Sequence, residues 1–310
     1  MKCTWIFLLF TIQISFAATN IDSLKQVAFD LDNNDTIRTR ALNSIAFDGF
    51  IFSNVDSTRY YAQMAIDLSE SFYYKMGIAD ATKTIGDSYL VGGGYDEAVP
   101  FYEKALEIFN EIKSPKGEAY LLNNLAGIYQ YQGKLDQSID MYIWSLDINE
   151  QLGNESTFGE LYFNIASLYQ TLEQYDKAIS YAQKAIESEG NTRTIAQANH
   201  LMANLQMRKA DYVSALHFVT IAEQLAEESD DEIILVEAYI TKGELYFDQG
   251  KELDAESEWE RALLIAKGLD DRQYSSKVEL KLAKHYYKEG NTRKAIRFWR
   301  VHCKRLKHLR

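Results

Sequence analysis

Apolar residues recur along this chain at the spacing of amphipathic helices that come in pairs. In one well-patterned stretch, Leu122, Leu125 and Tyr129 fall at i, i+3 and i+7, which places them on one face of a helix. A second apolar stripe follows at Leu135, Ile139, Tyr142 and Leu146. Gly133 separates the stripes, at a place where a helix end favours a left-handed residue. The pattern predicts two helices of roughly 15 to 17 residues joined by a tight turn.

Small residues repeat at three fixed places in this pattern. The first position holds Ala46, Gly86, Ala126, Ala166, Ala203, Gly243 and Ala283. The second, twelve residues later, holds Thr58, Ala98, Ser138, Ala178, Ala215, Ala255 and Ala295. The third, seven residues further on, holds Ala65, Ala105, Ser145, Ala185, Ala222, Ala262 and His302. Because small residues let two helices approach closely, the pattern predicts seven stacked helical hairpins.

Several local features refine this prediction. The first small positions are 40, 40, 40, 37, 40 and 40 residues apart, and we expect the short interval to tighten the loop around Gly190. Pro100 is expected to bend the helix that contains it. Ala262 is expected in a tight contact between helices, and Glu256 on the same helix is expected to be exposed.

The motifs resemble those of the tetratricopeptide repeat family. The matching residues are Leu125-Ala126-x-x-Tyr129 with Ser138, Tyr142 and Ser145, Ile85-Gly86-x-x-Tyr89 with Ala98, Tyr102 and Ala105, and Ile165-Ala166-x-x-Tyr169 with Ala178 and Ala185. The 40-residue period is similar to that of kinesin light chains and of bacterial sensor and regulator proteins. The resemblance implies an all-α, right-handed superhelical solenoid over residues 36–310. Its seven repeats would span about 36–75, 76–115, 116–155, 156–192, 193–232, 233–272 and 273–310. The family prefers Tyr where Gly49 stands.

The first residues predict an exported protein. Lys2 precedes a largely apolar stretch from Cys3 to Phe16, and Ser15 and Ala17 suit a cleavage site before Ala18. The alternative is a membrane anchor, but a stretch of about 14 residues is short of the roughly 20 that span a bilayer. We therefore expect a signal peptide over 1–17 and a capping segment over 18–35, with Asp35 as the N-cap of the next helix. The expected location is periplasmic or secreted, in a bacterial envelope.

Composition excludes several classes of protein. Hydrophobic residues make up 46% and charged residues 25% of the 310 residues, as in ordinary globular proteins. The net charge of −12 argues against nucleic acid as a partner. Two cysteines, Cys3 and Cys303, are too few for a disulfide framework, and cleavage would remove the first.

No catalytic, cofactor or metal motif is apparent, so we expect a protein that is not an enzyme. Gly92-Gly93-Gly94 lacks the Lys and Ser or Thr of a phosphate loop. Asp30, Asp32 and Asn34 imitate a calcium loop, which then fails because its sixth position is Asp35 instead of Gly. His302, Cys303 and His308 do not share the spacing of a zinc site.

The resemblance also implies a concave groove formed by the first helix of each hairpin, where the family holds a peptide. The main candidates for binding are Asn123, Gln130, Phe163, Gln170, His200 and Asn204. Other positions expected to face the groove are Asn43, Phe47, Lys83, Asp87, Arg208, Ile240 and Glu244. Amides suit this task because they both donate and accept hydrogen bonds. A clamp for a partner's terminal carboxylate is not expected, because Asp87 and Glu160 stand at places where the clamp has Asn and a basic residue.

Charge is concentrated at the C-terminal end. Residues 277–310 hold twelve Lys or Arg and two Glu, which leaves −22 of the formal charge on the rest of the chain. The residues of this basic end are Lys284, Lys288, Arg297, Arg300, Lys304 and Arg305. They could form a solvated end cap, a patch that binds anions or a membrane surface, or a surface that attracts the acidic body of another molecule. The oligomeric state is left open.

These observations predict an exported scaffold or adaptor that binds a protein or peptide in its groove. The alternative is a sensory module of a bacterial signalling system whose output lies on a separate protein, since the chain shows no motif of a kinase, a cyclase or a DNA-binding domain.

Overall fold

The computed structural model describes residues 21–269 and 271–307, with side chains as far as Val301. The expected signal peptide with its cleavage site at Ala17 and Ala18, and the side chain of His302, lie outside the described residues. Throughout the described part the chain forms helices and turns and contains no strand. The prediction of an all-α repeat fold is therefore confirmed.

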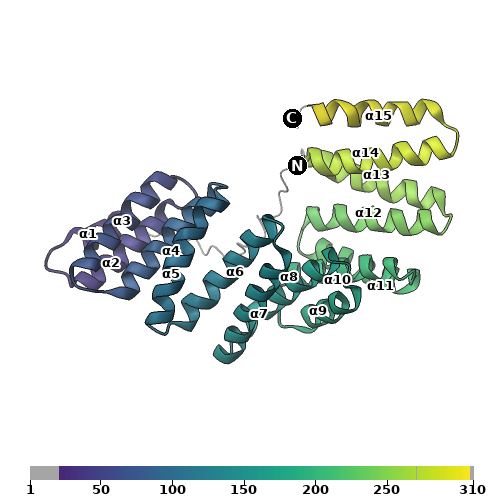
Figure 1. Cartoon of the computed structure of the whole chain (residues 1–310). Helices are drawn as coiled ribbons and strands as arrows, with labels where there is room; N and C mark the ends of the chain where they lie inside the picture. Colours follow the sequence, from purple (N-terminus) through teal and green to yellow (C-terminus); the bar gives the residue numbers. More distant parts are fainter. Residues whose placement is uncertain (1–20, 270, 308–310) are drawn as a thin grey trace. The chain divides into compact units, whose positions relative to one another are not determined.

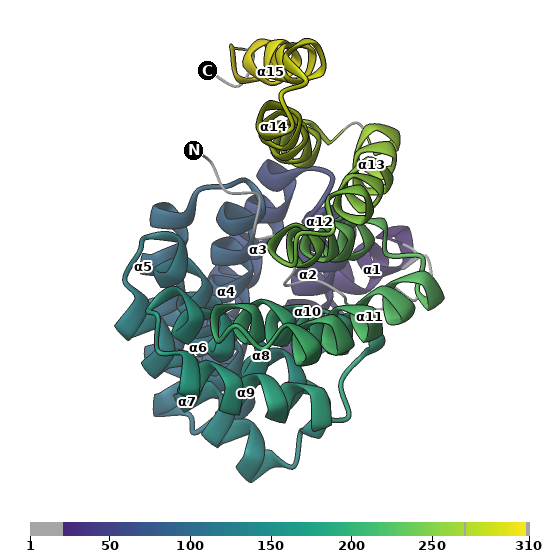
Figure 2. The same cartoon turned by 90° about the vertical axis from the view of Figure 1, so that its right-hand side faces the viewer.

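The helices divide into two compact units, and the boundary in the sequence lies between Gly153 and Asn154 (Figure 1). The helices of unit 1 are α1 Ile21–Phe29, α2 Asp35–Ser44, the π-helical η2 Ile45–Phe50, α3 Val55–Ser71, α4 Lys75–Val91, α5 Tyr95–Glu111, α6 Pro115–Tyr131 and α7 Leu135–Leu152. The helices of unit 2 are η3 Glu155–Thr157, α8 Phe158–Thr171, α9 Tyr175–Glu187, α10 Thr192–Arg208, α11 Tyr212–Glu228, α12 Glu232–Asp248, α13 Glu252–Gly268, α14 Arg272–Lys288 and α15 Thr292–Lys307. Within unit 2, α15 lies at the edge beside α14, as the rotated view also shows (Figure 2).

Consecutive helices pair as the sequence pattern predicts. The pairs are α2 with α3, α4 with α5, α6 with α7, α8 with α9, α10 with α11, α12 with α13 and α14 with α15. Each small position whose side chain is described is buried. In the described part of the chain no helix is long and apolar enough to cross a membrane.

Most turns between paired helices are three residues long and pass through a left-handed residue. Gly133, for which the sequence predicted this conformation, and the equivalent Gly93, Gly250 and Gly290 have φ between 74° and 77°. Glu173 and Ala210 occupy the same place without being glycine and still adopt φ of 58° and 59°. The hairpin geometry therefore imposes this conformation even on residues that disfavour it.

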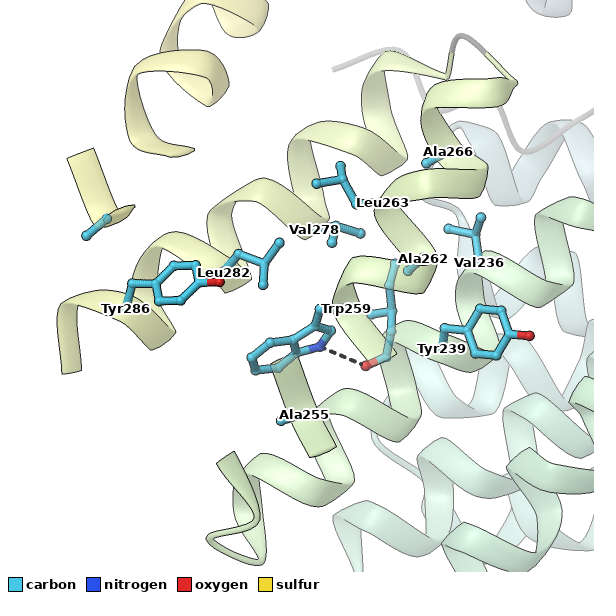
Figure 3. Close-up of a cluster of buried hydrophobic side chains, with 12 residues drawn as sticks. Val236, Tyr239, Ala255, Trp259, Ala262, Leu263, Ala266, Val278, Leu282 and Tyr286 are labelled. Carbon is cyan, nitrogen blue, oxygen red and sulfur yellow. Dashed lines mark hydrogen bonds between the residues drawn. The ribbon is translucent and has the colours of Figure 1, made fainter. Parts of the chain in front are cut away.

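Packing in unit 2 shows why the small positions matter (Figure 3). Trp259 of α13 donates its indole N–H to the carbonyl of Ile240 at 3.3 Å. A Cβ added at Gly243 would lie 2.3 Å from that indole nitrogen. Ala262 is fully buried in the same cluster, as predicted. The expectation that Glu256 is exposed was wrong, because its side chain is 19% exposed and accepts a hydrogen bond from Tyr286.

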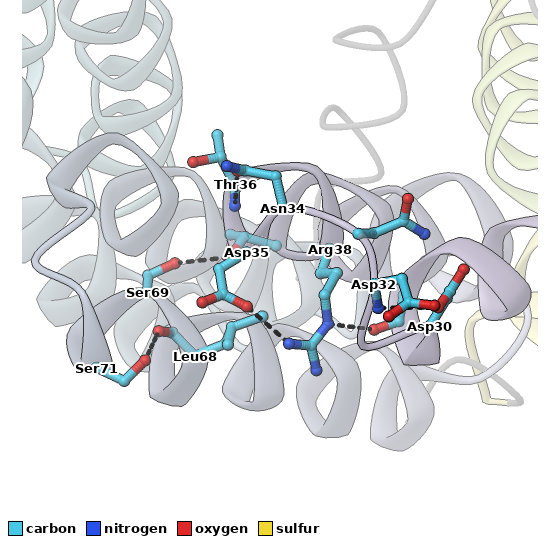
Figure 4. Close-up of polar contacts among 12 residues, drawn as sticks. Asp30, Asp32, Asn34, Asp35, Thr36, Arg38, Leu68, Ser69 and Ser71 are labelled. Atoms are coloured by element: carbon cyan, nitrogen blue, oxygen red, sulfur yellow. Dashed lines mark hydrogen bonds and ion pairs between the residues drawn. The ribbon is translucent and has the colours of Figure 1, made fainter.

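The N-terminal cap also differs in detail from the prediction (Figure 4). Asn34 is the N-cap of α2, and its side chain accepts a hydrogen bond from the Thr36 amide at 2.8 Å. Asp35 is instead the first helical residue and pairs with Arg38 at 2.7 Å. Helix α1 lies within the segment 18–35 that was predicted to cap the array. A Cβ at Gly49 would lie 3.2 Å from Ile21 of α1, so the capping helix packs where the family has its Tyr.

The interval between the fourth and fifth hairpins is shorter because one helix, α9, is shorter than the helices that follow it in α10 and α11. Helix α9 has 13 residues, whereas α10 and α11 have 17 each. The connection from Ser188 to Asn191 is one residue longer than the usual turn. The prediction of a tighter loop was therefore wrong. Pro100 lies inside α5 as predicted.

A candidate peptide-binding pocket in unit 2

The ends of the first helices of unit 2 line a pocket of about 650 Å³. Helices α8, α10, α12 and α14 each contribute residues from their last turns, and α9 and α13 contribute one residue each. The lining residues are Gln170, Thr171, Glu173, Tyr175, Asn204, Met207, Arg208, Glu244, Phe247, Asp248, Trp259, Lys281, Lys284 and His285. Four successive hairpins thus contribute to one site.

The pocket combines apolar surface with charges of both signs. The half-buried Tyr175, Met207 and Phe247 provide the apolar part, and the buried Trp259 lies beneath them. Glu244 is neutralised by an ion pair with Lys281. Arg208, Lys284, Glu173 and Asp248 form no ion pair with any described residue, so two cations and two anions are available to a ligand.

The structure distributes the predicted groove residues over both units. Gln170 and Asn204 line the pocket. Phe163 packs against the cluster of apolar residues around Leu201. Asn123 and Gln130 are half-buried residues of α6, in unit 1.

His200 is held by a hydrogen-bonded network inside unit 2. Its Nε2 lies 2.9 Å from the Thr241 hydroxyl and 3.3 Å from the Asn204 amide nitrogen, and its Nδ1 lies 3.6 Å from Glu237. Tyr274 of α14 donates its hydroxyl to Glu237 at 2.5 Å. Burial lowers the pKa of His200, although the charge of Glu237 opposes this effect. The network joins α10, α12 and α14, and it therefore holds three of the helices that line the pocket in place relative to one another.

A comparable network joins α4, α5 and α6 in unit 1. The Asp87 carboxylate accepts hydrogen bonds from Lys83 at 3.0 Å, from Tyr102 at 2.7 Å and from Tyr120 at 3.3 Å. Lys83 also lies over the ring of Phe47, 4.9 Å from its centroid. Burial alone would lower the pKa of Lys83, but the Asp87 carboxylate holds it above its usual value. Lys83 and Asp87 are therefore engaged with each other, and Asp87 is almost fully buried.

The residues of the basic end have separate environments. Lys284 lines the pocket, and Lys288 lies 3.4 Å from Glu252 and over the ring of Phe247. Arg297 and Arg300 are exposed on α15. The side chains of Lys304 and Arg305 lie outside the described residues.

Glu256, His285 and Glu289 bring three possible metal ligands within 4.8 Å of one another. Glu256 already accepts a hydrogen bond from Tyr286 and lies 3.5 Å from Lys294. Burial alone would raise the pKa of Glu256, but Tyr286 and Lys294 lower it. These three residues therefore serve to connect α13, α14 and α15 through hydrogen bonds and ion pairs.

Sequence reasoning missed the aromatic part of the pocket. Trp259 comes from a second helix, whereas the groove prediction considered first helices alone. A signal was present, because Trp259 follows Gly243 by sixteen residues, as Tyr102 follows Gly86. A bulky residue at that distance marks a side chain packed against the small position.

Comparisons with known proteins agree with this architecture. Residues 77–151 and 117–188 match the family model described as tetratricopeptide repeat. No protein with a curated description matches the sequence.

Among solved structures, a signal-transduction ATPase with a tetratricopeptide repeat sensor from Pyrococcus horikoshii is similar, with a TM-score of 0.69 and 20% identity, over 79% of this chain and 38% of that one. The apo form of RapI has a TM-score of 0.68 and 14% identity, over 87% of this chain and 98% of that one. The apo quorum sensor NprR from B. thuringiensis has a TM-score of 0.62 and 11% identity, over 92% and 97%. At these identities the likeness concerns the fold alone. Residues 77–188 thus match the tetratricopeptide repeat family, and the helical hairpins and these neighbours show that the described chain has the fold of a tetratricopeptide repeat solenoid.

Proposed function

We propose that this protein is an exported scaffold that binds a peptide segment of a partner protein in the pocket of unit 2. The tetratricopeptide repeat fold is typical of protein-binding scaffolds that are not enzymes. The observation that carries the proposal is the pocket itself, which joins four hairpins and is lined by aromatic, amide and charged side chains.

The lining suits a peptide because it offers a partner for each kind of peptide group. Gln170 and Asn204 can donate to and accept from a peptide backbone. The half-buried Tyr175, Met207 and Phe247 provide apolar area for a side chain, and aromatic residues and Arg are enriched in protein interfaces. Unpaired charges of both signs favour a segment that carries complementary charges in a fixed order.

The proposal is tested by capture of partners from the native envelope and mass spectrometry. The double variant Gln170→Ala with Arg208→Ala should lose the captured partner while its helical circular dichroism is unchanged. The matched control is Gln183→Ala with Lys267→Ala, which likewise removes one glutamine and one positive charge, but from exposed positions outside the pocket. Equal capture by both double variants would contradict the pocket assignment.

Two further variants compare the pocket with other surfaces. Asn123→Ala with Asn204→Ala removes one of the predicted groove amides from each unit, and we expect weaker capture because Asn204 lines the pocket. Neutralising Arg300, Lys304 and Arg305 should matter less at physiological salt, because exposed charges are screened. Loss of capture only in the neutralised variant would assign binding to the basic end. Capture of a regulator protein instead of envelope proteins would favour the alternative of a sensory module.

Export is a separate part of the proposal and has its own test. We expect the mature chain from the native host to begin at Ala18, which N-terminal sequencing determines. A soluble product in the cytosol that retains Met1 would contradict export.

A further inference from the structure

The last hairpin leaves uncovered a position that each earlier hairpin buries. Sixteen residues after the first small position, the earlier hairpins have Ala62, Tyr102, Tyr142, Ala182, Val219 and Trp259, none more than 3% exposed. The equivalent Trp299 of α15 is 41% exposed. In the hairpin before it, α14 covers this position, since the rings of Trp259 and His285 are 6.0 Å apart. Trp299 therefore marks a place where a further element would pack.

Trp299 belongs to a larger surface, which we call the terminal patch. Its apolar part consists of Ile296, Trp299 and Tyr287, and the rings of Trp299 and Tyr287 are 5.9 Å apart. Arg293, Arg297 and Arg300 lie on the neighbouring face of α15, are exposed and form no ion pair with a described residue. No acidic residue occurs between Thr292 and Lys307. A protein surface that carries both apolar and acidic side chains would complement the terminal patch.

The chain itself carries a surface of this kind, at the turn between α1 and α2. In this N-terminal turn the exposed residues Phe29 and Leu31 alternate with the exposed residues Asp30 and Asp32. Figure 4 shows the two carboxylates at the end of α1. The turn is held in place, because the Asp32 amide donates to Asp30 at 3.0 Å and Arg38 donates to the Ala28 carbonyl at 3.1 Å. A preformed turn loses little conformational freedom on binding.

Contacts inside unit 2 use the same pairing of charges. Lys288 and Lys294 of the last hairpin lie 3.4 Å from Glu252 and 3.5 Å from Glu256 of the hairpin before it. Lys288 and Lys294, which face the preceding hairpin, are thus paired with acidic residues. The arginines beside Trp299 have no such partner among the described residues. A protein surface with acidic and apolar residues continues this arrangement.

We propose that the N-terminal turn of a second copy of this chain docks on the terminal patch. Phe29 and Leu31 would cover Ile296 and Trp299, and Asp30 and Asp32 would face the arginines. The two surfaces differ, so the contact is heterologous and each copy retains one free surface of each kind. Association can therefore continue beyond a dimer.

Sedimentation velocity tests the proposal on the purified protein. From about 1 to about 100 µM, the range of weak protein contacts, the sedimentation coefficient should rise with concentration. Raising NaCl from about 0.05 to about 0.5 M should weaken association at least about fivefold, because salt screens the charges. A monomer at all concentrations would overturn the proposal.

Charge reversal identifies the two surfaces. The variant Arg297→Glu with Arg300→Glu and the variant Asp30→Lys with Asp32→Lys should each be monomeric. Mixed in equal amounts, they should associate again, because the intact turn of one variant meets the intact patch of the other and the two reversed surfaces are themselves complementary in charge. Reversal of the exposed residues Lys104 and Lys116 to Glu changes the net charge equally to the first variant and should leave association intact.

Two other outcomes would overturn the proposal. Failure of the mixture to associate, with both variants showing the helical circular dichroism of the parent, would exclude pairing of these surfaces. A monomeric parent that binds vesicles containing phosphatidylserine, and loses this binding on Arg297→Glu with Arg300→Glu, would assign the patch to anionic membranes.

Discussion

At the scale of the residue, the unusual groups of this protein are polar side chains buried within helical packing. Lys83 and Asp87 neutralise each other, and His200 shares a network with Thr241 and Glu237. Glu160 of α8 differs, because burial raises its pKa to about 7 and no charged group offsets the effect. Its protonation therefore influences stability.

We expect the variant Glu160→Gln to be more stable than the parent above pH 7. Between pH 4.5 and about 7 the unfolded chain releases the Glu160 proton while the folded chain keeps it. The free energy of unfolding therefore falls as pH rises through this window, by roughly 3 kcal/mol at most. Gln keeps the shape of the neutral acid and removes this loss.

Thermal melts at pH 5 and pH 8 check this prediction. The difference between Glu160→Gln and the parent should be small at pH 5 and clear at pH 8. The exposed acid Glu155, changed to Gln, should show no such dependence. Equal differences at both pH values would contradict the prediction.

At the scale of the element, each helical hairpin depends on a turn and a close contact. The turn requires a left-handed residue, and the contact requires small residues opposite bulky ones such as Trp259. The two requirements act at different places in a hairpin and can be tested separately.

Gly133→Ala tests the turn. A Cβ at Gly133 meets no atom within 4 Å, so the only penalty is its φ of 74°. We expect a loss of about 1 kcal/mol in the free energy of unfolding, measured by urea denaturation. Gly268→Ala is the matched control, because it too meets no atom within 4 Å and ends α13 with helical geometry. It should be neutral or gain up to about 1 kcal/mol. Equal effects of both changes would exclude a role for φ.

Ala262→Leu tests the contact. Ala262 is fully buried between helices of unit 2, so the added methyl groups should overpack the cluster and cost about 1–3 kcal/mol. Ser257→Leu introduces the same residue at an exposed position of α13 and should be nearly neutral in the same thermal melt. A melting temperature that Ala262→Leu leaves unchanged would contradict the packing.

At the scale of the whole molecule, the chain consists of two units with separate apolar clusters. The cluster around Trp259 and the cluster around Leu201 lie in unit 2, and the cluster around Tyr102 lies in unit 1. Stacked repeats interact mainly with their neighbours, so each unit holds its stabilising contacts within itself.

Residues 154–310 are therefore expected to fold alone. The fragment should show helical circular dichroism and a cooperative thermal transition. A fragment of residues 175–310 begins at α9 and lacks its partner α8, so it should be less stable. An unfolded 154–310 fragment would show that unit 2 depends on the rest of the chain.

Periodicity predicted most of this architecture because a hairpin is specified by residues close together in sequence. The small positions, the turn glycines and the paired stripes all act within about 40 residues, the length of one repeat. The errors at individual residues had two origins, a contact with the next hairpin and a local shift of one residue. Glu256 is covered by Tyr286 of the next hairpin, and the side chain of Asn34 takes the capping role assigned to its neighbour.

The sequence by itself determined an all-α repeat, its register and an uneven distribution of charge. Only the tertiary structure decided which polar residues are available to a ligand. Gln170 and Arg208 reach the pocket, whereas Lys83 and Asp87 face each other and His200 joins a network. The physical reason is that availability depends on partners from other helices. Helical spacing determines the face on which a side chain lies, and the neighbouring hairpin determines whether that side chain is already bonded.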